Sequence, residues 1–586
     1  MRFHSVSWAL VLAASAARNV YAVSIYDVCT VSYVNASLPQ EVTYLGTTPV
    51  TILPSSIQVN PVINNTVSGA SFFPDAEFDY CNVTFAYTHT GRNDSVQVTY
   101  WLPAPTSFKN RYLATGGGGY AINSGIGNTG SLPGGVIYGA VAGATDGGFG
   151  SFSNNFDSVY IIQNGTVDLE SLFMFGYQAI HELTLLGQLF TQSFFNMSDD
   201  KLYSYYQGCS EGGRDGWSQV QRFTDFDGVI TGAPAFRFSF QQVQHLYSNI
   251  VQQTLDYYPP ACELQKILNE TLAFCDPLDG LTDGVVARTD LCKLQFNTSS
   301  IVGKSYYCPA TPEFLGFPPA PAWPEQNGTV AAEGVEVANT IIDGLHDTDG
   351  KRVYLSYQPS SIFADGYTSY NTTSSEWGLY INSFGSEFVA RYLELLDTST
   401  LPNLDGVTYD TLKKWIIEGW KKYEDTLQTT WPDLTEYHDS GGKILHFHGE
   451  SDFSIPTASS VRYHESVRSI MYSNLTYNES TEALGDWYRL YLVPGAQHCA
   501  PNAYEPNGPF PQTNLGVLIE WVENGVVPVT LNATHLAGDK VGENAQICAW
   551  PLRPLWDVDG NMDCVFDQAS IDTWVYDFDS FKLPVY

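Results

Sequence analysis

Two patterns of apolar and polar positions recur along the chain. Short apolar runs, some with polar residues at every second position, predict strands, and longer runs with apolar residues every three or four positions predict helices. The longest predicted helix covers about 172–195. The strands that we expect are 96–101, 202–206, 228–231, 443–447 and 487–493. Because strands and helices alternate, we predict an α/β protein with a mainly parallel sheet.

The alternation stops between residues 236 and 441, where the chain is rich in aromatic residues, Pro and Asn. One sheet domain with one insertion explains this pattern best. The segments that we predict are a leader at 1–22, the first part of the sheet domain at 23–237, the insertion at 238–440 and the second part at 441–586.

The N-terminus has the features of a signal peptide. Arg2 provides a positive charge, an apolar run covers Val6 to Ala17, and small residues precede a cleavage position near Ala22. The run is shorter than the roughly 20 residues that a membrane-spanning helix needs. No later segment is long and apolar enough to span, so we expect a secreted protein without a membrane anchor.

The amino-acid composition excludes some classes of binding partner and predicts some covalent modifications. A formal net charge of −35 over 586 residues argues against binding to nucleic acid or anionic membranes. Ten cysteines without a CxxC pair predict disulfides rather than a thiolate zinc site. The sequence carries no information on oligomeric state. An excess of N-x-S/T sequons predicts N-linked glycans, and the sequons begin at Asn35, Asn64, Asn82, Asn93, Asn164, Asn196, Asn269, Asn297, Asn327, Asn371, Asn474, Asn478 and Asn532.

A glycine-flanked serine lies between a predicted strand and a predicted helix. Residues 208–212 match G-x-S-x-G, with Ser210 at the centre. In this context the glycines leave room for a sharp turn that exposes the serine hydroxyl. The pattern is short, and by itself an ordinary glycine turn explains it equally well.

Two later segments favour the catalytic interpretation. Asp452 follows one predicted strand and His498 follows the next. Ser, Asp and His in this order form the triad of α/β-hydrolases. A serine hydroxyl needs an imidazole to accept its proton, and a carboxylate fixes the tautomer of the imidazole. We therefore predict an α/β-hydrolase fold and a serine esterase with Ser210 as nucleophile, His498 as base and Asp452 as orienting acid. In such hydrolases an insertion forms a lid.

Further residues are expected to assist this site. Cys209 and Cys499 adjoin the serine and the histidine, so a disulfide between them would hold the two loops together. An oxyanion hole needs two N–H donors. The residue after the nucleophile, Glu211, is expected to supply one, and Gly117 or Gly118 in a glycine-rich loop the other.

The insertion contains an acidic loop with two interpretations. Its carboxylates and carbonyls have the hard oxygens that Ca²⁺ prefers, although the loop does not match an EF-hand. A solvated acidic turn explains the spacing almost as well. The candidate ligands are Asp276, Asp279, Leu281, Asp283 and Val285.

Two alternating histidines, His446 and His448, look like a metal-binding pair. We expect their rings to face opposite sides of the strand and to lack a third ligand, so we assign them no metal.

The chain resembles the tannase and feruloyl esterase family, most closely its fungal tannase members. The motifs that carry the resemblance are 208–214 (GCSEGGR), 218–221 (SQVQ), 231–236 (TGAPAF), 254–260 (TLDYYPP), 427–430 (LQTT), 448–452 (HGESD) and 498–499 (HC).

The resemblance implies a large lid over the nucleophile and a structural Ca²⁺ in the acidic loop, with no organic cofactor. It also implies the Cys209–Cys499 bridge, and it favours Cys275–Cys292, which would close the calcium loop. The remaining pairs that go with it are Cys29–Cys81, Cys548–Cys564 and Cys262–Cys308.

We expect a polyphenolic ester as substrate, with galloyl esters hydrolysed to gallic acid. The phenolic hydroxyls are expected to meet carboxylates or amides of the lid. A feruloyl esterase with the same triad is the nearest alternative. A secreted binding protein that has lost catalysis is an alternative of another class.

Overall fold

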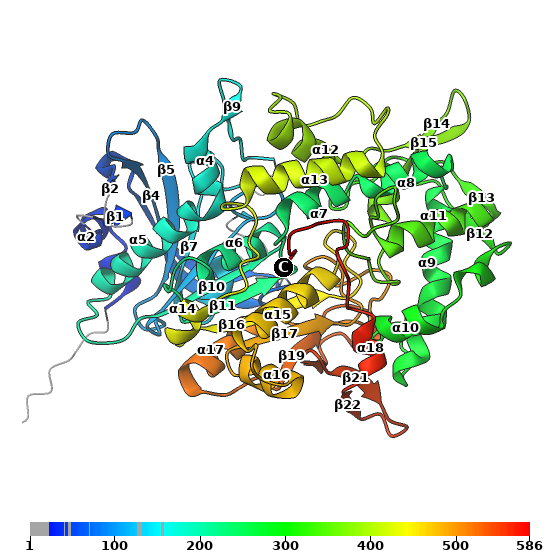
Figure 1. Ribbon diagram of the computed structural model, residues 1–586. Helices are drawn as coiled ribbons and strands as arrows, with labels where there is room; N and C mark the ends of the chain where they lie inside the picture. The colour runs from blue at the N-terminus through cyan, green and yellow to red at the C-terminus, as the bar shows by residue number, and fades with distance from the viewer. Residues whose placement is uncertain (1–22, 40–41, 45–47, 70, 126–131, 154–156) are drawn as a thin grey trace, which may run out of the picture.

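The computed structural model describes residues 23–39, 42–44, 48–69, 71–125, 132–153 and 157–586. The predicted signal peptide at 1–22 lies outside them. One 11-stranded sheet forms the centre of a mixed α/β fold, as Figure 1 shows. No helix in the described ranges is long and apolar enough to cross a membrane.

The sheet has a parallel part and an antiparallel part. Six neighbouring strands are parallel, in the order β7 (Ala140–Thr145), β6 (Arg111–Thr115), β10 (Tyr203–Cys209), β11 (Gly228–Gly232), β16 (Lys443–Gly449) and β17 (Tyr488–Val493). An antiparallel part continues from β7 through β5 (Val96–Pro103), β4 (Ala76–His89), β2 (Thr48–Ile52) and β1 (Val42–Tyr44), and β3 (Gln58–Val67) also pairs with β4. The prediction of a mainly parallel central sheet is confirmed.

Neighbouring residues on the central strands enter two separate cores. Tyr206 belongs to one hydrophobic cluster and Tyr205 to the other, and Val229 and Ile230 divide in the same way. Successive side chains of a strand point to opposite faces, so both faces of the sheet are covered. One face carries α5 (Ala179–Phe194), α6 (Glu211–Val220) and α15 (Ala458–Met471), and the other carries α3 (Leu132–Val136) and α17 (Asn514–Asn524).

The long helix predicted at 172–195 is present as an uninterrupted helical run over residues 169–194, but its geometry changes along its length. It consists of α4 (Leu169–Phe173), a π-helical turn η2 (Met174–Gln178) and α5. Arg214 donates to the carbonyl oxygens of Phe175 and Gly176, at 2.8 and 2.7 Å, within the π turn. Such turns are frequent next to functional sites.

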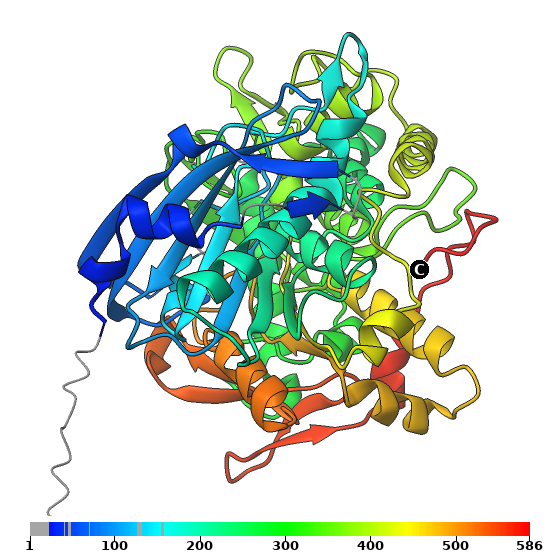
Figure 2. The same cartoon turned by 90° about the vertical axis from the view of Figure 1, so that its left-hand side faces the viewer.

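A largely helical segment separates β11 from β16. In Figure 1 it lies in green and yellow to one side of the sheet and across one end of it, and Figure 2 shows the same molecule from the edge formed by the antiparallel strands. Its main helices are α7 (Phe238–Gln244), α8 (Tyr247–Leu255), α9 (Ala261–Cys275), α10 (Thr289–Gln295), α11 (Ala332–Asp343), α12 (Ser383–Glu387) and α13 (Tyr409–Tyr423). Its hairpins pair β12 (Ser305–Cys308) with β13 (Gln326–Thr329) and β14 (Thr368–Asn371) with β15 (Glu376–Leu379).

The ten cysteines form five disulfides. The pairs are those that the resemblance implies: Cys29–Cys81, Cys209–Cys499, Cys262–Cys308, Cys275–Cys292 and Cys548–Cys564.

Candidate active site

Ser210 occupies a tight turn between β10 and α6. Its backbone has φ 66° and ψ −124°, a conformation that non-glycine residues rarely adopt. The flanking glycines make the turn possible, because a Cβ on Gly208 would lie 2.4 Å from the carbonyl oxygen of Gly212. The sequence therefore folds into a strained elbow that presents the serine side chain at the end of a buried strand.

A hydrogen-bond chain joins the three predicted residues. The Ser210 Oγ and His498 Nε2 atoms are 2.8 Å apart, and His498 Nδ1 lies 2.8 Å from Asp452 Oδ2. Asp452 follows β16 and His498 follows β17, so the end of the parallel sheet gathers residues that are distant in sequence. This geometry fits proton transfer from the serine to an imidazole held by a carboxylate.

Asp452 is fully buried and receives several donors. Its Oδ1 accepts the backbone N–H groups of Ser454 and Ile455, at 2.8 and 2.9 Å. Burial raises the pKa of Asp452, but the charge of His498 and the hydrogen bonds from His448 and His498 outweigh it, so the pKa lies well below its ordinary value. Asp452 is therefore held as a carboxylate.

His448 contacts the carboxylate of Asp452, a contact that the sequence interpretation missed. Its Nε2 lies 3.0 Å from Asp452 Oδ2, so Asp452 contacts two imidazoles. The prediction that His446 and His448 face opposite sides is wrong, since residues two apart on a strand share a face. Both rings contact the hydroxyl of Ser460, at 2.7 and 2.6 Å. In the sequence, the feature that pointed to this contact was that His448 and Asp452 lie four positions apart just after the same predicted strand.

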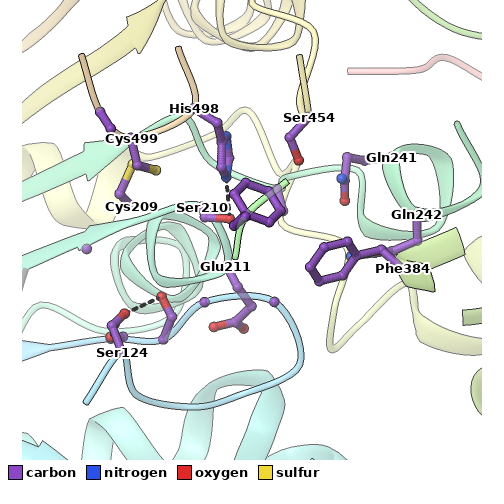
Figure 3. A pocket seen from close by; sticks show the side chains of 18 of the residues that line it. Ser124, Cys209, Ser210, Glu211, Gln241, Gln242, Phe384, Ser454, His498 and Cys499 are labelled. Atoms are coloured by element: carbon purple, nitrogen blue, oxygen red, sulfur yellow. Dashed lines mark hydrogen bonds between the residues drawn. A yellow bond between two sulfur atoms is a disulfide. The ribbon is translucent and has the colours of Figure 1, made fainter. Parts of the chain in front are cut away.

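The disulfide Cys209–Cys499 lies directly beside the reacting pair. Its two Cα atoms are 6.1 Å apart, within the ordinary range for a disulfide. Figure 3 shows the sulfur–sulfur bond next to Ser210 and His498. The bridge therefore fixes the separation of the loops that carry these two residues.

A cavity of about 420 Å³ opens at the Ser210–His498 pair. It lies between the sheet and the inserted segment, which contributes part of its wall. Residues of the sheet domain that line it include Gly116–Gly119, Ser124 and Glu211; those of the insertion are Gln241, Gln242, His245, Phe317 and Phe384. The cavity wall therefore combines polar groups with the apolar rings of Phe317 and Phe384, as the walls of small-molecule binding sites do.

The glycine-rich loop lies against the nucleophile turn, but two of its N–H groups have other acceptors. Gly117 N–H donates to Asp215 Oδ2 at 3.3 Å, and Gly118 N–H donates to the carbonyl oxygen of Ala121 at 3.1 Å. In this conformation neither is free as the second oxyanion donor, which departs from the prediction. Glu211 begins α6, where amide N–H groups lack intrahelical acceptors, so its role as the first donor stays a prediction.

A buried ionic cluster supports both the turn and the glycine loop. Arg214 contacts the carboxylates of Glu211 and Asp215, and all three side chains are fully buried. Burial raises the pKa of Asp215 to about 6, although the charge of Arg214 opposes it. Because Asp215 also accepts from Gly117, the cluster links α6 to the loop at the cavity wall.

The acidic loop is compact and partly buried. The carboxylates of Asp279 and Asp276 accept the backbone N–H groups of Leu281 and Asp283, at 2.9 and 3.0 Å. Burial raises the pKa of Asp279 to about 7, and the neighbouring charges of Asp283 and Asp276 add to this. Among the residues described, three or more acidic, histidine or cysteine side chains nowhere converge as a ready set of metal ligands. A cation in this loop would therefore need carbonyl oxygens as well, such as those of Leu281 and Val285.

Comparison with known proteins gives a consistent assignment. The family model described as tannase and feruloyl esterase matches residues 81–571. The chain is 50% identical to a tannase of Aspergillus oryzae over 605 aligned residues, with 100% of each chain covered.

Solved structures show the same relationship. A tannin acyl hydrolase from Aspergillus niger has a TM-score of 0.91 and 59% identity, over 96% of this chain and 99% of that chain. Feruloyl esterase B from Aspergillus oryzae has a TM-score of 0.65 and 25% identity, over 88% and 97%. The chain therefore belongs to the tannase and feruloyl esterase family and is a carboxylic ester hydrolase.

Proposed function

We propose that this protein is a serine esterase that hydrolyses galloyl esters of tannins and simple gallates and releases gallic acid. The observation that carries the proposal is the continuous chain of short contacts from Ser210 through His498 to Asp452 at the cavity. The galloyl specificity is supported by the likeness to the two Aspergillus tannases.

In the proposed mechanism, Ser210 Oγ attacks the ester carbonyl carbon while His498 Nε2 accepts the serine proton. His498 then protonates the leaving alcohol oxygen, and the galloyl group stays bound to Ser210 as an acyl-enzyme. A water molecule next gives a proton to His498 and adds to the acyl carbon. Ser210 departs with that proton, and gallic acid is released. Asp452 stabilises the imidazolium in both halves.

The oxyanion of each tetrahedral intermediate needs preorganised donors. The Glu211 N–H supplies one. Because Gly117 and Gly118 donate elsewhere, Gly119 is the candidate for the second, since it also lines the cavity.

The inserted segment 238–440 is proposed as the lid of the active site. It contributes Gln241, Phe317 and Phe384 to the cavity wall opposite the reacting pair. Residues 23–237 and 441–586 then form the hydrolase domain, because both parts contribute strands to the central sheet.

A structural Ca²⁺ is proposed in the acidic loop of the lid. The chemistry of the donors supports this ion, because the charges of Asp276 and Asp283 act on the buried Asp279 and carboxylate oxygens are ligands that Ca²⁺ prefers, although Lys540 lies 3.6 Å from Asp283. Carbonyl oxygens of Leu281 and Val285 would complete the ligands. The ion would neutralise the loop and hold it in place.

Secretion with N-linked glycans is also proposed. Five disulfides support it, since disulfides persist in oxidising compartments. The N-x-S/T sequons and the predicted signal peptide at 1–22 also support secretion and glycosylation.

A feruloyl esterase remains the second candidate, because feruloyl esterase B covers 88% of this chain. A binding protein without catalysis is the alternative of another class. Labelling with a fluorophosphonate tests the serine. The proposal expects one label per chain in the unmodified protein and none in Ser210→Ala, together with loss of ester hydrolysis. Hydrolysis that survives in Ser210→Ala would remove Ser210 from the mechanism.

A further inference from the structure

Four arginine side chains of the described residues are buried, and three of them are neutralised by carboxylates. Each of the three contacts two carboxylates: Arg214 those of Glu211 and Asp215, Arg288 those of Asp290 and Asp567, and Arg553 those of Asp290 and Glu450. The fourth, Arg237, is the residue before α7 and is 0% exposed. It forms no ion pair with a carboxylate in the described part of the chain.

Arg237 stays charged despite its burial. Burial lowers the pKa of Arg237 to about 10, so the guanidinium is a cation at neutral pH. The groups that act on this pKa are the phenols of Tyr354 and Tyr463 and a second cation, Arg462. Both phenols are neutral at that pH, because burial raises their pKa values. Buried charges are paired in folded proteins, so Arg237 requires a negative partner.

Donors around this charge lack acceptors. Arg237 Nη1 donates to the carbonyl oxygen and the hydroxyl of Ser459, at 3.1 and 2.7 Å. Its Nε and Nη2 atoms are buried and have no hydrogen-bond partner among the residues that the structure describes. The same holds for the hydroxyl of Tyr354, which lies beside the Ser459 side chain. N–H and O–H groups gathered next to a cation match the requirements of an anion.

Neutral acceptors do not meet this requirement. Gln428 pairs with Arg237 through the backbone and has a buried side-chain oxygen without a partner, but an amide carries no charge. A water molecule could accept from the same donors and would also leave the charge of Arg237 uncompensated. Only an anion satisfies the donors and the charge together.

We propose that Arg237 and Tyr354 bind a monovalent anion of the size of chloride at the start of the inserted segment. The Nε and Nη2 atoms of Arg237 and the Tyr354 hydroxyl donate to the ion. Both side chains are 0% exposed, which favours a compact ion over a larger polyatomic one. The ion joins the residue before α7 to Ser459 on α15, next to Ser460, whose hydroxyl contacts the ring of His448.

The dependence of Tm on chloride tests this assignment. The purified protein is dialysed into sodium gluconate, and chloride then replaces gluconate at constant ionic strength, so that the screening of surface charges does not change. A ligand that binds only the folded state raises Tm. Chloride is therefore expected to raise Tm by roughly 1–4 °C with a saturating dependence, and bromide is expected to act in the same way.

Three variants locate the response. Arg237→Met removes the cation and is expected to abolish the effect of chloride on Tm. Tyr354→Phe keeps the ring and loses one donor, so the chloride concentration at half of the response should rise roughly three- to tenfold. Arg92→Met is the control, because it removes the same charge at the surface, where Arg92 pairs with Glu170 at 3.3 Å. This variant should keep the full response.

Anomalous diffraction from crystals grown in bromide locates the ion without any variant. A peak within hydrogen-bond distance of Arg237 and Tyr354 is expected. A Tm that does not respond to chloride, a full response in Arg237→Met, or no bromide at this position would each overturn the assignment. If Arg237→Met does not fold, Tyr354→Phe and the bromide position decide. None of these measurements uses ester turnover, so their outcome is independent of the proposed function.

Discussion

Cys209 and Cys499 are bonded to each other across 290 positions of sequence, and each adjoins one member of the Ser210–His498 pair. Cys499 itself has φ 58°, a backbone conformation that is unfavourable for this residue type. The bridge acts where a small displacement would separate the serine hydroxyl from the imidazole. Preorganisation of reacting groups is among the larger contributions to catalysis.

Removal of this bridge should therefore affect rate and stability together. The double variant Cys209→Ser/Cys499→Ser is expected to lower the free energy of unfolding by about 2–5 kcal/mol and to lower kcat. Ester hydrolysis and thermal unfolding measure the two effects. The control is Cys548→Ser/Cys564→Ser, because that bridge does not line the cavity and its loss should alter stability alone. A Cys209/Cys499 variant with unchanged kcat would contradict the positioning role.

His448 should influence catalysis through Asp452. Replacement by phenylalanine removes a hydrogen bond to a buried carboxylate, so kcat is expected to fall roughly ten- to hundredfold. The lost donor also raises the pKa of Asp452, so activity at acidic pH should fall more than activity at neutral pH. The pH profile of kcat and fluorophosphonate labelling are the measurements. Unchanged kcat across pH would exclude this role.

Asp290 should make the stability of the protein depend on pH. Burial raises the pKa of Asp290, but the charge of Arg553 and the hydrogen bond from Arg288 outweigh it, and the pKa falls to about 2. Because the folded pKa lies below the unfolded value of about 4, the stabilisation is present above pH 4 and is lost as pH falls toward 2.

The variant Asp290→Asn isolates this contribution. Near pH 6 it is expected to unfold more easily than the unmodified protein, with a pH-dependent part of about 2 kcal/mol. That part should shrink between pH 5 and pH 2. Urea unfolding at several pH values measures it, and a difference between the two proteins that grows as pH falls would contradict the assignment.

Chelation should destabilise the protein if the acidic loop binds Ca²⁺. A ligand that binds only the folded state raises Tm, so EGTA is expected to lower Tm and added Ca²⁺ to restore it. Asp279→Asn should abolish this response. Asp557→Asn, in an exposed acidic turn, should keep it. The loop also contacts the segment that follows His498, since Val286 N–H donates to Glu505 Oε1 at 2.8 Å. An unchanged Tm in EGTA would exclude a structural ion.

The sequence predicts the parts of this site that depend on short-range patterns. The turn at Ser210 and the strand ends before Asp452 and His498 follow from glycine placement and apolar periodicity. The contacts between Gln241, His245 and Asp365 could not be predicted, because they join positions up to 120 residues apart within the irregular insertion.

Local geometry explains the other departures. Gly117 and Gly118 occupy the expected loop, but the direction of each N–H depends on backbone torsions that composition does not fix. The π turn before α5 leaves no signal in the apolar periodicity, and two of its carbonyl oxygens accept from Arg214, a residue on another helix. The Gly117 and Arg214 contacts join positions that are distant in sequence, whereas the Gly118 contact is a local turn to Ala121.

The galloyl specificity of the Ser210 site is tested by the initial rate of acid release from methyl gallate and methyl ferulate by the purified protein, with Ser210→Ala as the blank. We expect a strong preference for methyl gallate and no release by the blank. Preference for methyl ferulate would contradict the galloyl specificity and leave the Ser210–His498–Asp452 assignment in place.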